Sequence, residues 1–423
     1  MKRLILLLSI SILVLSSCED KHLQTYMANV PVYLSYDALR SSFKVSDERE
    51  LNKPGKIYFK ENYMYINEYQ AGIHVVDLSD PEDPRKIAFV EIPGNVDMSI
   101  RNDILYAESY VDLVLIDVSD PSQPELIKRI EDMFEYVIPP YDYDYPLDEI
   151  DEEKGVITGY EIKKITREID RNPYTWPFYY DYASLTSSTG APKMNGGNSY
   201  GVGGSMARFI TYDDYLYALE STYKLKVIDI SNTDQVEMIS EQSLWGNIET
   251  DFIADQHMYL GTSNGMHILS LDVPSFPNLL STYRHITACD PVVVEGDWAY
   301  VTLRSGNFCG GNQNLLEVID ISVKTDPVRE ASFGMKSPYG VGIDQGTLFV
   351  CQGEFGLRIF DASDIQSIPQ NEIAYFPGIH AYDVIPLGTI LLVIGDDGFQ
   401  IYDYSNLEDI HLLGALPVQP PED

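Results

Sequence analysis

A hydrophobic run that ends in Asp or Ser recurs seven times along the chain, and this repeat restricts the fold more than any other feature. The runs end at the following residues: Asp77, Asp117, Asp229, Ser270, Asp320, Asp361 and Asp403. Most of them lie about 40 residues apart, a period typical of β-propeller blades built from several short strands. The sequence therefore predicts an all-β fold, a seven-bladed β-propeller of four-stranded blades with a large insertion between two blades.

Each copy of the repeat reads as four strands separated by turn signals. In the second copy the predicted strands are 96–100, 104–108, 113–117 and 125–130, and the fifth copy repeats the pattern with 292–295, 298–303 and 315–320. One position of the second strand is bulky in every copy: Tyr65, Tyr106, Tyr217, Tyr259, Tyr300, Phe349 and Leu392. A stacked repeat buries the same face each time, so we expect these side chains to pack between blades.

Three copies carry a closely similar motif at the end of the third predicted strand. The motif reads LVLIDVS at 113–119, KVIDIS at 226–231 and EVIDIS at 317–322. These segments resemble the LVIVD repeat, and the chain resembles the bacterial LVIVD-repeat lipoproteins. The resemblance implies a propeller fold and an exported protein, but it supplies no catalytic residues.

The Asp of each motif is followed two residues later by Ser, and this pairing admits two interpretations. Aspartates in series suggest metal ligands. At the end of a strand and before a turn, however, Asp and Ser side chains accept backbone N–H bonds, as they do in Asx and Ser turns. The second interpretation is favoured, and the prolines that follow the motif place the fourth strand at an outer edge.

The N-terminal segment has the layout of a secretory signal. Lys2 and Arg3 precede an apolar stretch at 4–15 that is too short to span a bilayer, and the residues ending at Cys18 resemble a lipobox. We expect a signal peptide at 1–17 and lipidation of Cys18, which would attach the protein to a membrane by acyl chains. The alternative is a plain signal peptide with an incidental cysteine.

This interpretation sets the predicted organisation and location. It gives a lipidated tether and lead-in segment at 18–55, the propeller at 56–417 with an insertion at 131–205, and a short tail at 418–423. The expected location is the outer membrane, with the protein facing the periplasm or the cell surface.

The chain is strongly acidic, with 65 Asp and Glu against 29 Lys and Arg and a formal net charge of −36. Nucleic acid is excluded as a partner because phosphate backbones bind through clustered Lys and Arg, and the sequence has no such cluster. The acidity is interpreted as a source of solubility for an exported protein, with cation binding as the alternative.

Three cysteines follow Cys18, in a compartment where disulfides persist. Cys289 precedes the first strand of the fifth copy and Cys309 lies in the long loop of that copy, so both belong to one face and a disulfide is geometrically reasonable. The segments around them also look like the corresponding blade of other LVIVD proteins, which supports the pair. Cys351 falls within a strand, where we expect a buried and unreactive thiol.

The unusual segments of the sequence all belong to one face of the predicted disc. Because strands alternate in direction, the start of strand one, the loop between strands two and three, and the end of strand four share a face. The insertion at 131–205 and the long loop at 305–314 both leave from it. The aromatic part of the insertion, 174–182, is either a lid packed on the propeller or a surface that binds sugar or protein.

The starts of the innermost strands should surround the mouth of the central channel, which is the default pocket of a propeller. Alignment of the copies places the following candidate ligand-binding residues there: Lys56, Asp97, Arg208, Asp251, Asp290, Tyr339, His380 and Asp383. Their mixed charge suits a polar or cationic small ligand or a peptide. A mouth that is merely solvated by polar residues is the alternative.

The sequence favours a non-catalytic binding or scaffold module that holds a glycan, a peptide or an envelope protein. No hydrolase, zinc-protease or dinucleotide motif is present, so no catalytic residue, metal or cofactor is predicted. One alternative is a polysaccharide hydrolase or lyase that uses Asp97 and Asp383 as acid and base. A second alternative, a subunit of an outer-membrane complex, predicts a broad exposed apolar patch.

Overall fold

The computed structural model describes residues 22–169 and 208–419, except for 222, 247, 263–264, 285–290, 306–312 and 397. The chain divides into two units, one of Met1–Leu34 with Ile138–Ser187 and one of Ser35–Val137 with Ser188–Asp423. Within the described residues, no helix has the length and apolar character needed to cross a membrane.

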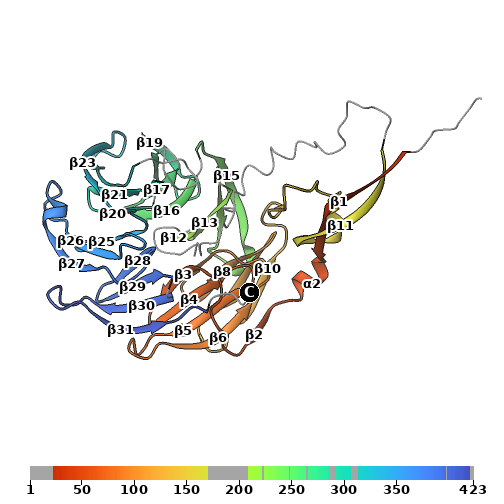
Figure 1. The fold of residues 1–423 in the computed structure, drawn as a ribbon, viewed down its shortest axis with the longest axis horizontal. Coiled ribbons are helices and arrows are strands. Elements are labelled where there is room, and N and C mark those ends of the chain that lie inside the picture. The colour runs from red at the N-terminus through yellow and green to blue at the C-terminus, as the bar shows by residue number, and fades with distance from the viewer. Residues whose placement is uncertain are drawn as a thin grey trace, which may run out of the picture. The chain divides into compact units, whose positions relative to one another are not determined.

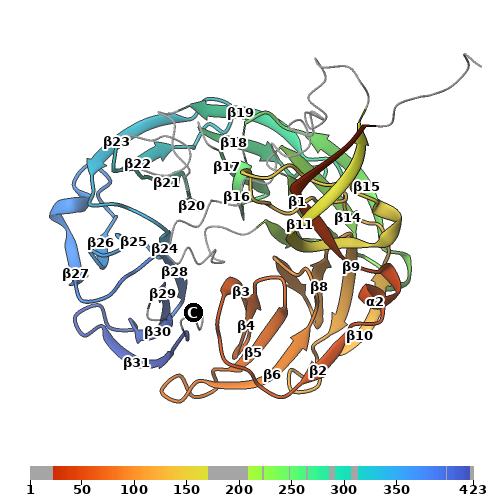
Figure 2. The ribbon, with the colours of Figure 1, turned by 45° about the vertical axis from the view of Figure 1, so that its right-hand side comes forward.

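The larger unit is a seven-bladed β-propeller, as the repeat predicted. Each blade is an antiparallel sheet whose strands follow chain order from the axis outward (Figure 2). The first three blades comprise β3 (Pro54–Lys60), β4 (Tyr63–Glu68), β5 (Gly72–Asp77) and β6 (Arg85–Glu91); β7 (Met98–Arg101), β8 (Ile104–Ser109), β9 (Asp112–Asp117) and β10 (Glu125–Ile130); and β12 (Phe209–Tyr212), β13 (Tyr215–Ser221), β14 (Lys224–Asp229) and β15 (Glu237–Ser243). The fourth and fifth comprise β16 (Ile248–Ala254), β17 (His257–Thr262), β18 (Gly265–Ser270) and β19 (Asn278–Arg284); and β20 (Val292–Glu295), β21 (Trp298–Leu303), β22 (Leu315–Asp320) and β23 (Val328–Gly334). The last two comprise β24 (Val341–Asp344), β25 (Thr347–Cys351), β26 (Leu357–Asp361) and β27 (Glu372–Phe376); and β28 (Asp383–Leu387), β29 (Ile390–Gly395), β30 (Gly398–Asp403) and β31 (His411–Leu416).

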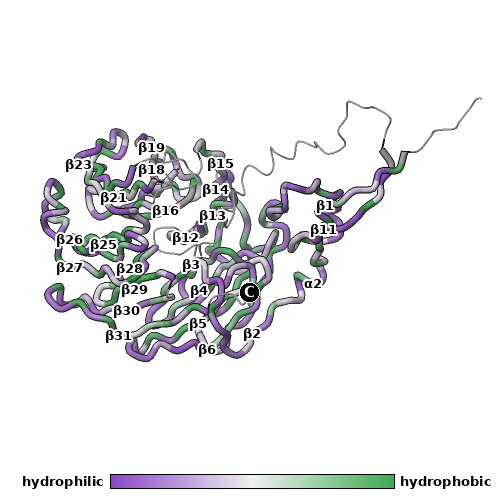
Figure 3. Tube along the Cα trace, viewed as in Figure 1, coloured by the Kyte–Doolittle hydropathy of each residue, from purple (hydrophilic) through white to green (hydrophobic). Residues whose placement is uncertain are grey.

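The second and third strands of each blade form the core. Their side chains are buried almost without interruption, because both faces of a blade pack against neighbouring blades. The bulky residue of each second strand is buried as predicted, from Tyr65 to Leu392. Hydrophobic residues follow the strands and hydrophilic residues gather in the connecting turns (Figure 3).

The Asp and Ser of each motif form the predicted turn. The backbone N–H of Ser79, Ser119, Ser231, Ser322, Ser363 and Ser405 donates to Oδ1 of the Asp two residues earlier. In the degenerate fourth copy, Ser270 accepts the equivalent bond from Asp272 through its hydroxyl. Hydrogen bonds from the hydroxyl and then the backbone N–H of the motif Ser lower the pKa of five of the aspartates, such as Asp117, and the side chains therefore act in turn formation.

The first blade departs from the prediction that the fourth strand is always an edge. A short strand, β2 (Lys44–Ser46), pairs with β6 and makes this a five-stranded sheet. The prediction was wrong here because the edge of β6 stays available to any extended segment, and the lead-in supplies one.

A short helix, α2 (Tyr36–Arg40), precedes β2 and is held to the second blade by ion pairs. Arg40 donates to the carboxylate of Asp112, which is fully buried and also accepts from Arg129 and from the backbone of Asp132. The lead-in is therefore an integral part of the propeller from residue 35 onward.

The smaller unit is a long antiparallel ribbon that the sequence did not reveal. Strand β1 (His22–Leu34) pairs along its length with β11 (Val156–Ile169), and a 3₁₀ turn, η1 (Glu152–Lys154), precedes β11. Asn29 fixes the intervening loop, because its side chain donates to the carbonyls of Asp142 and Tyr145. The predicted insertion thus pairs with the lead-in segment, and its aromatic part at 174–182 lies outside the described residues.

Blades one and seven close the ring through apolar contacts. All four strands of the seventh blade come from the C-terminal end of the chain, so no strand is shared between the two ends (Figure 1). Ile66 and Val76 of blade one pack with Phe399 and Ile401 of blade seven. One backbone bond adds to this seam, from the N–H of Gln419 to the carbonyl of Leu51.

Candidate functional site

The propeller has two distinct faces. The entry face is where the first strand of each blade begins; it also carries the loops between strands two and three, such as 69–71, 110–111 and 352–356, and the ends of the fourth strands. The opposite turn face carries the hairpins between strands one and two, such as 61–62, and the Asp-Ser loops. The 131–137 segment leaves the end of β10 and the 304–314 loop leaves the end of β21, so both excursions start from the entry face as predicted.

Charged residues from five blades meet at the axis on the entry face. Lys56, near the start of β3, interacts electrostatically with the following residues of four other blades: Asp97, Arg208, Asp251 and Asp383. Only at the axis of the ring can one side chain reach four other blades. Lys56 and the three aspartates are all buried, and burial lowers the pKa of Lys56.

Asp97 joins the second blade to the third. Its Oδ1 accepts the N–H of Met98 and its Oδ2 accepts the N–H of Arg208, both at 2.7 Å. Burial raises the pKa of the Asp97 carboxyl, against the opposing effect of Lys56 and these two hydrogen bonds. Arg208 in turn donates from Nη2 to the carbonyl of Leu219, so the hydrogen bonds of Asp97 and Arg208 stabilise the contact between the second and third blades.

The carboxylate of Asp251 makes no comparable hydrogen bond to the described residues. Its side chain is 1% exposed, and neither carboxylate oxygen has a hydrogen-bond partner within the described part of the chain. Burial and the neighbouring Asp97 raise the pKa of Asp251 well above its usual range. A buried carboxylate without hydrogen bonds is costly, so its presence at the axis calls for a function or a partner.

The structure adds Glu108, which the sequence analysis missed. Glu108 lies at the end of β8, and burial raises its pKa to about 7, with Arg208 and backbone N–H groups opposing the shift. It interacts electrostatically with Tyr69, which interacts in turn with Tyr110. One signal could have found it, because no other copy has an acidic residue two positions after the bulky residue of strand two.

Two predicted residues lie on the entry face outside this charge cluster. Tyr339 packs edge-on against Tyr382 and lies beneath Arg304, whose guanidinium carbon is 4.0 Å from the ring centroid. His380 is exposed and pairs with Asp396 through Nδ1 at 2.6 Å. Neither is among the residues that interact with Lys56.

The remaining predictions divide between described and undescribed residues. Cys351 is buried and burial raises the pKa of its thiol, as expected for an unreactive cysteine. Three predictions fall on residues outside the described part of the chain: ligand binding by Asp290, lipidation of Cys18 and the disulfide between Cys289 and Cys309.

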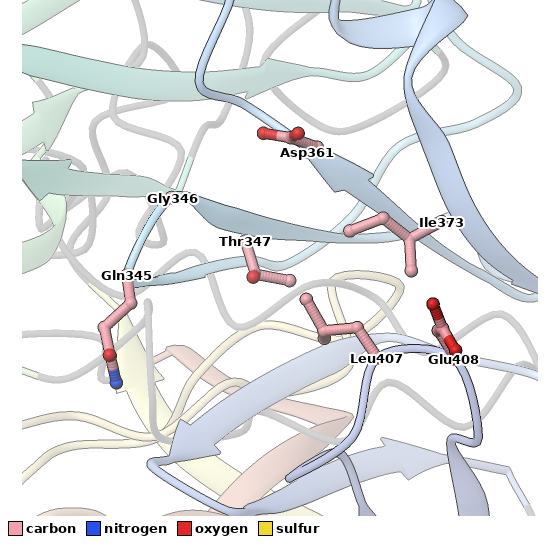
Figure 4. A pocket seen from close by; sticks show the side chains of 7 residues that line it. All are labelled: Gln345, Gly346, Thr347, Asp361, Ile373, Leu407 and Glu408. Carbon is pink, nitrogen blue, oxygen red and sulfur yellow. The ribbon is translucent and has the colours of Figure 1, made fainter.

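Two surface hollows lie on the turn face, away from the charge cluster. The larger, of about 520 Å³, lies between blades six and seven and is lined by Gln345, Thr347, Asp361, Ile373, Leu407 and Glu408 (Figure 4). The smaller, of about 350 Å³, is formed by the Asp-Ser loop of blade four around Phe276. None of the predicted binding residues lines either hollow.

Both the repeat motif and the fold have counterparts among known proteins. The model of the LVIVD repeat matches residues 55–88, 102–132 and 287–333. The chain carries LVIVD repeats. The matched segments fall in blades one, two and five of this LVIVD-repeat propeller, and a comparison with curated protein sequences gave no significant match.

Solved structures resemble this LVIVD-repeat propeller at low sequence identity. The computationally designed Ika8 protein is 9% identical, with a TM-score of 0.52 over 89% of this chain and 91% of that one. BamB from Moraxella catarrhalis is 8% identical, with a TM-score of 0.49 over 89% of this chain and 98% of that one. Hsv2p from Kluyveromyces lactis is 10% identical, with a TM-score of 0.49 over 85% and 97%. At these identities the likeness to Ika8 supports the propeller fold alone.

Proposed function

We propose that the protein is a membrane-anchored, extracytoplasmic, non-catalytic binding module that holds a partner on its entry face. The observation that carries this proposal is the composition of that face. Aromatic side chains gather on its loops: Tyr69, Tyr110, Tyr223, Trp245, Tyr339, Phe355 and Tyr382. Aromatic and Arg residues are enriched at the centres of binding interfaces.

The turn face has a different character. Its exposed loops carry acidic residues such as Glu82, Asp120 and Asp409, with aspartates occupied in the turns themselves. The turn face also carries aromatic side chains, such as Tyr212, Trp298 and Phe276, but both long excursions of the chain leave from the entry face. Loops on a rigid scaffold are the usual position of binding residues.

The carboxylates nominated for catalysis support binding instead. Asp97 is buried and both of its oxygens accept backbone N–H bonds, whereas an acid or base must reach a substrate in an open cleft. Asp97 and Asp383 both interact with Lys56. A glycosidase pair flanking a sugar is therefore disfavoured.

The exposed apolar residues of the blades do not favour a broad assembly surface. Some lie on the outer strands, such as Ile127 on β10, Met238 on β15 and Leu412 on β31, and others lie in separate loops, such as Val273 and Val323. Surface apolar residues scattered in this way are normal and need no partner.

The binding proposal is tested by site-specific photo-crosslinking in the cell envelope. A photoreactive amino acid at Trp245, which is 42% exposed on the entry face, should capture a partner reproducibly. The matched control is Phe276, which is 57% exposed on the turn face. Capture from Phe276 alone, or from neither position, would contradict the proposal.

The anchor is tested separately. Lipidation of Cys18 is proposed from the lipobox-like residues that precede it, and the Cys289–Cys309 disulfide is proposed to brace the entry-face loop. Cys18→Ser should move the protein from the membrane to the soluble fraction, and Cys309→Ser should leave it in the membrane. Unchanged fractionation of Cys18→Ser would refute the anchor.

A further inference from the structure

Two basic side chains on the entry face of blade five lie over aromatic rings and not against carboxylates. The guanidinium carbon of Arg304 is 4.0 Å from the ring centroid of Tyr339, and Nζ of Lys336 is 5.6 Å from the ring centroid of Phe355. Neither basic group forms an ion pair with a carboxylate of the described residues. Most other arginines of the propeller do form such a pair: Arg40, Arg49, Arg85, Arg101, Arg129, Arg329 and Arg358.

Hydrogen bonds of one asparagine bring the two basic residues to the same place. Oδ1 of Asn314 accepts the N–H of Ser305 at 2.8 Å, and the backbone carbonyl of Asn314 accepts the N–H of Met335 at 3.0 Å. Ser305 and Met335 are the chain neighbours of Arg304 and Lys336. Asn314 therefore holds together the two segments that carry the positive charges.

The two aromatic rings are also neighbours. Tyr339 packs against Gly353, where an added Cβ would lie 2.6 Å from the ring, and Phe355 follows two residues later in the same loop. Gly353 has a φ of 56° and exchanges backbone hydrogen bonds with Ala381 at 2.8 and 3.1 Å, which fixes the loop. The two rings and the two cations over them form a cationic patch that is preformed, which reduces the entropic cost of binding.

The carboxylates around the cationic patch do not neutralise it. Asp396 is engaged, because its Oδ2 accepts from the hydroxyl of Tyr382 at 2.9 Å and pairs with Nδ1 of His380 at 2.6 Å. Asp383 is fully buried. Glu354 is exposed in the loop that carries one of the rings, so the patch has two positive charges against one negative charge. At physiological ionic strength, exposed charges more than about 8 Å away are largely screened, so the acidity of the rest of the protein does not cancel this excess.

The contact with the ring leaves Arg304 able to bind an anion. A guanidinium can lie over an aromatic ring and still donate, because its five N–H donors lie in its own plane. The guanidinium of Arg304 makes no hydrogen bond to the described residues. A carboxylate matches this group, since it accepts two parallel N–H bonds. A sugar that stacks on Tyr339 would instead compete with Arg304 for the face of the ring.

We propose that the cationic patch binds a carboxylate of an acidic peptide segment in the partner. The proposal rests on the binding function assigned to the entry face, and it names the chemistry that this face recognises. Arg304 holds the carboxylate in a bidentate pair, and Lys336 contributes the second positive charge. Tyr and Arg are among the residues that dominate the energetics of binding interfaces.

The probe is a fluorescent tetraglutamate peptide, with tetraglutamine as the neutral analogue. Each is titrated into the detergent-solubilised full-length protein at physiological ionic strength and followed by anisotropy. The protein should bind tetraglutamate more tightly. Arg304→Gln should weaken this binding by about 3- to 10-fold and Lys336→Gln by about 2- to 5-fold, because the first loses a bidentate charge pair and the second an exposed one. Equal binding of the two peptides would overturn the proposal.

Arg85→Gln is the matched control for general electrostatic attraction. The Arg85 side chain is 62% exposed on the turn face and pairs with Asp77, so the substitution removes the same charge from the opposite face. It should leave the affinity for tetraglutamate within about twofold of the wild type. An equal effect of Arg85→Gln and Arg304→Gln would contradict the site. Continued capture of a partner by crosslinking at Trp245 would then leave the binding function of the entry face intact.

Tyr339→Leu tests the ring under Arg304. Loss of the ring should weaken tetraglutamate binding by about 2- to 5-fold, because the guanidinium loses the contact that positions it. Tyr339→Phe keeps the ring and should recover most of the lost affinity. Equally weak binding by both variants would show that the ring does not position Arg304.

Tetragalacturonate separates an acidic peptide from an acidic glycan, since both carry carboxylates. Titrated under the same conditions, it should bind more weakly than tetraglutamate, because Arg304 covers the ring face on which a sugar would stack. Tighter binding of tetragalacturonate that is lost in Arg304→Gln would assign the patch to a glycan and overturn the peptide partner.

Discussion

Asp97 and Asp251 place the same functional group at the same end of the propeller, but their hydrogen bonding differs. Asp97 accepts two backbone N–H bonds, one from Met98 of its own blade and one from Arg208 of the next, and Asp251 accepts none from the described residues. The stability of the protein should therefore depend on the first carboxylate far more than on the second. Buried position alone does not distinguish them.

We predict that Asp97→Ala destabilises the protein by about 1 to 3 kcal/mol, because two buried N–H groups lose their acceptors. Asp251→Asn should change the stability by less than about 1 kcal/mol, since no hydrogen bond to the described residues is lost and the raised pKa of Asp251 already favours its uncharged form. Urea unfolding of the two variants checks the contrast. A larger loss for Asp251→Asn would show that this carboxylate has a structural partner.

Glu108 should also affect how the stability of the protein changes with pH. Its pKa is about 7 in the folded protein, above the ordinary value of 4.5, so the folded state holds this proton more tightly than the unfolded chain does. The unfolded chain therefore binds fewer protons between these values, and the contribution of Glu108 to stability falls as the pH rises through them. Relative to Glu108→Gln, the wild-type protein should lose stability between about pH 4.5 and 7. Above about pH 7 the stability curves of the two proteins should run parallel. Melting temperatures across this range provide the measurement, and parallel curves throughout would contradict the assignment.

At the scale of elements, the most concentrated interaction is the one that holds α2 to the second blade. Asp112 is completely buried and accepts from Arg40, Arg129 and the backbone of Asp132. Asp112→Ala should cost about 3 to 5 kcal/mol, because it leaves a buried Arg129 without its partner. Asp132→Asn is the control: its carboxylate is 73% exposed and pairs with the same Arg40, and Asn tolerates the positive φ of this position, so loss of the charge should cost less than about 1 kcal/mol. Equal losses in denaturant unfolding would show that burial does not set the difference.

The elements also show what the sequence could predict. Because the blades repeat, the strand positions expected in one copy can be checked against those in the other copies. Strands such as β10, β20, β21 and β22 have the predicted bounds. Strands β1 and β2 were missed because they do not repeat and their partners lie far along the chain, as in the pairing of His22 with Ile169. The candidate site was predicted in the same way: alignment located Lys56 and Asp97, but it gave no means to distinguish a satisfied carboxylate from an unsatisfied one.

For the whole propeller, the decisive feature is how the ring closes. Blades one and seven share no strand, so within the described residues the seam between them depends on side-chain packing and on the backbone bond from Gln419 to Leu51. Neighbouring blades elsewhere are also joined by packing, but they are consecutive along the chain. The seam alone must bring together two segments more than 300 residues apart, such as Ile66 and Phe399, which makes its formation entropically the most costly step in closing the ring.

The seam should therefore be the weakest point of the ring when its packing is reduced. Phe399 is fully buried between blades one and seven, and Phe399→Ala should cost about 3 to 5 kcal/mol through lost burial and the remaining cavity. Leu412→Ala, at a position 52% exposed on β31 of the same blade, should change the stability by less than about 0.5 kcal/mol. Hydrogen exchange should show the loss first in β3–β6 and β28–β31, because these blades open together when the seam fails. Uniform loss of protection across all seven blades would instead mean that the ring unfolds as one cooperative unit.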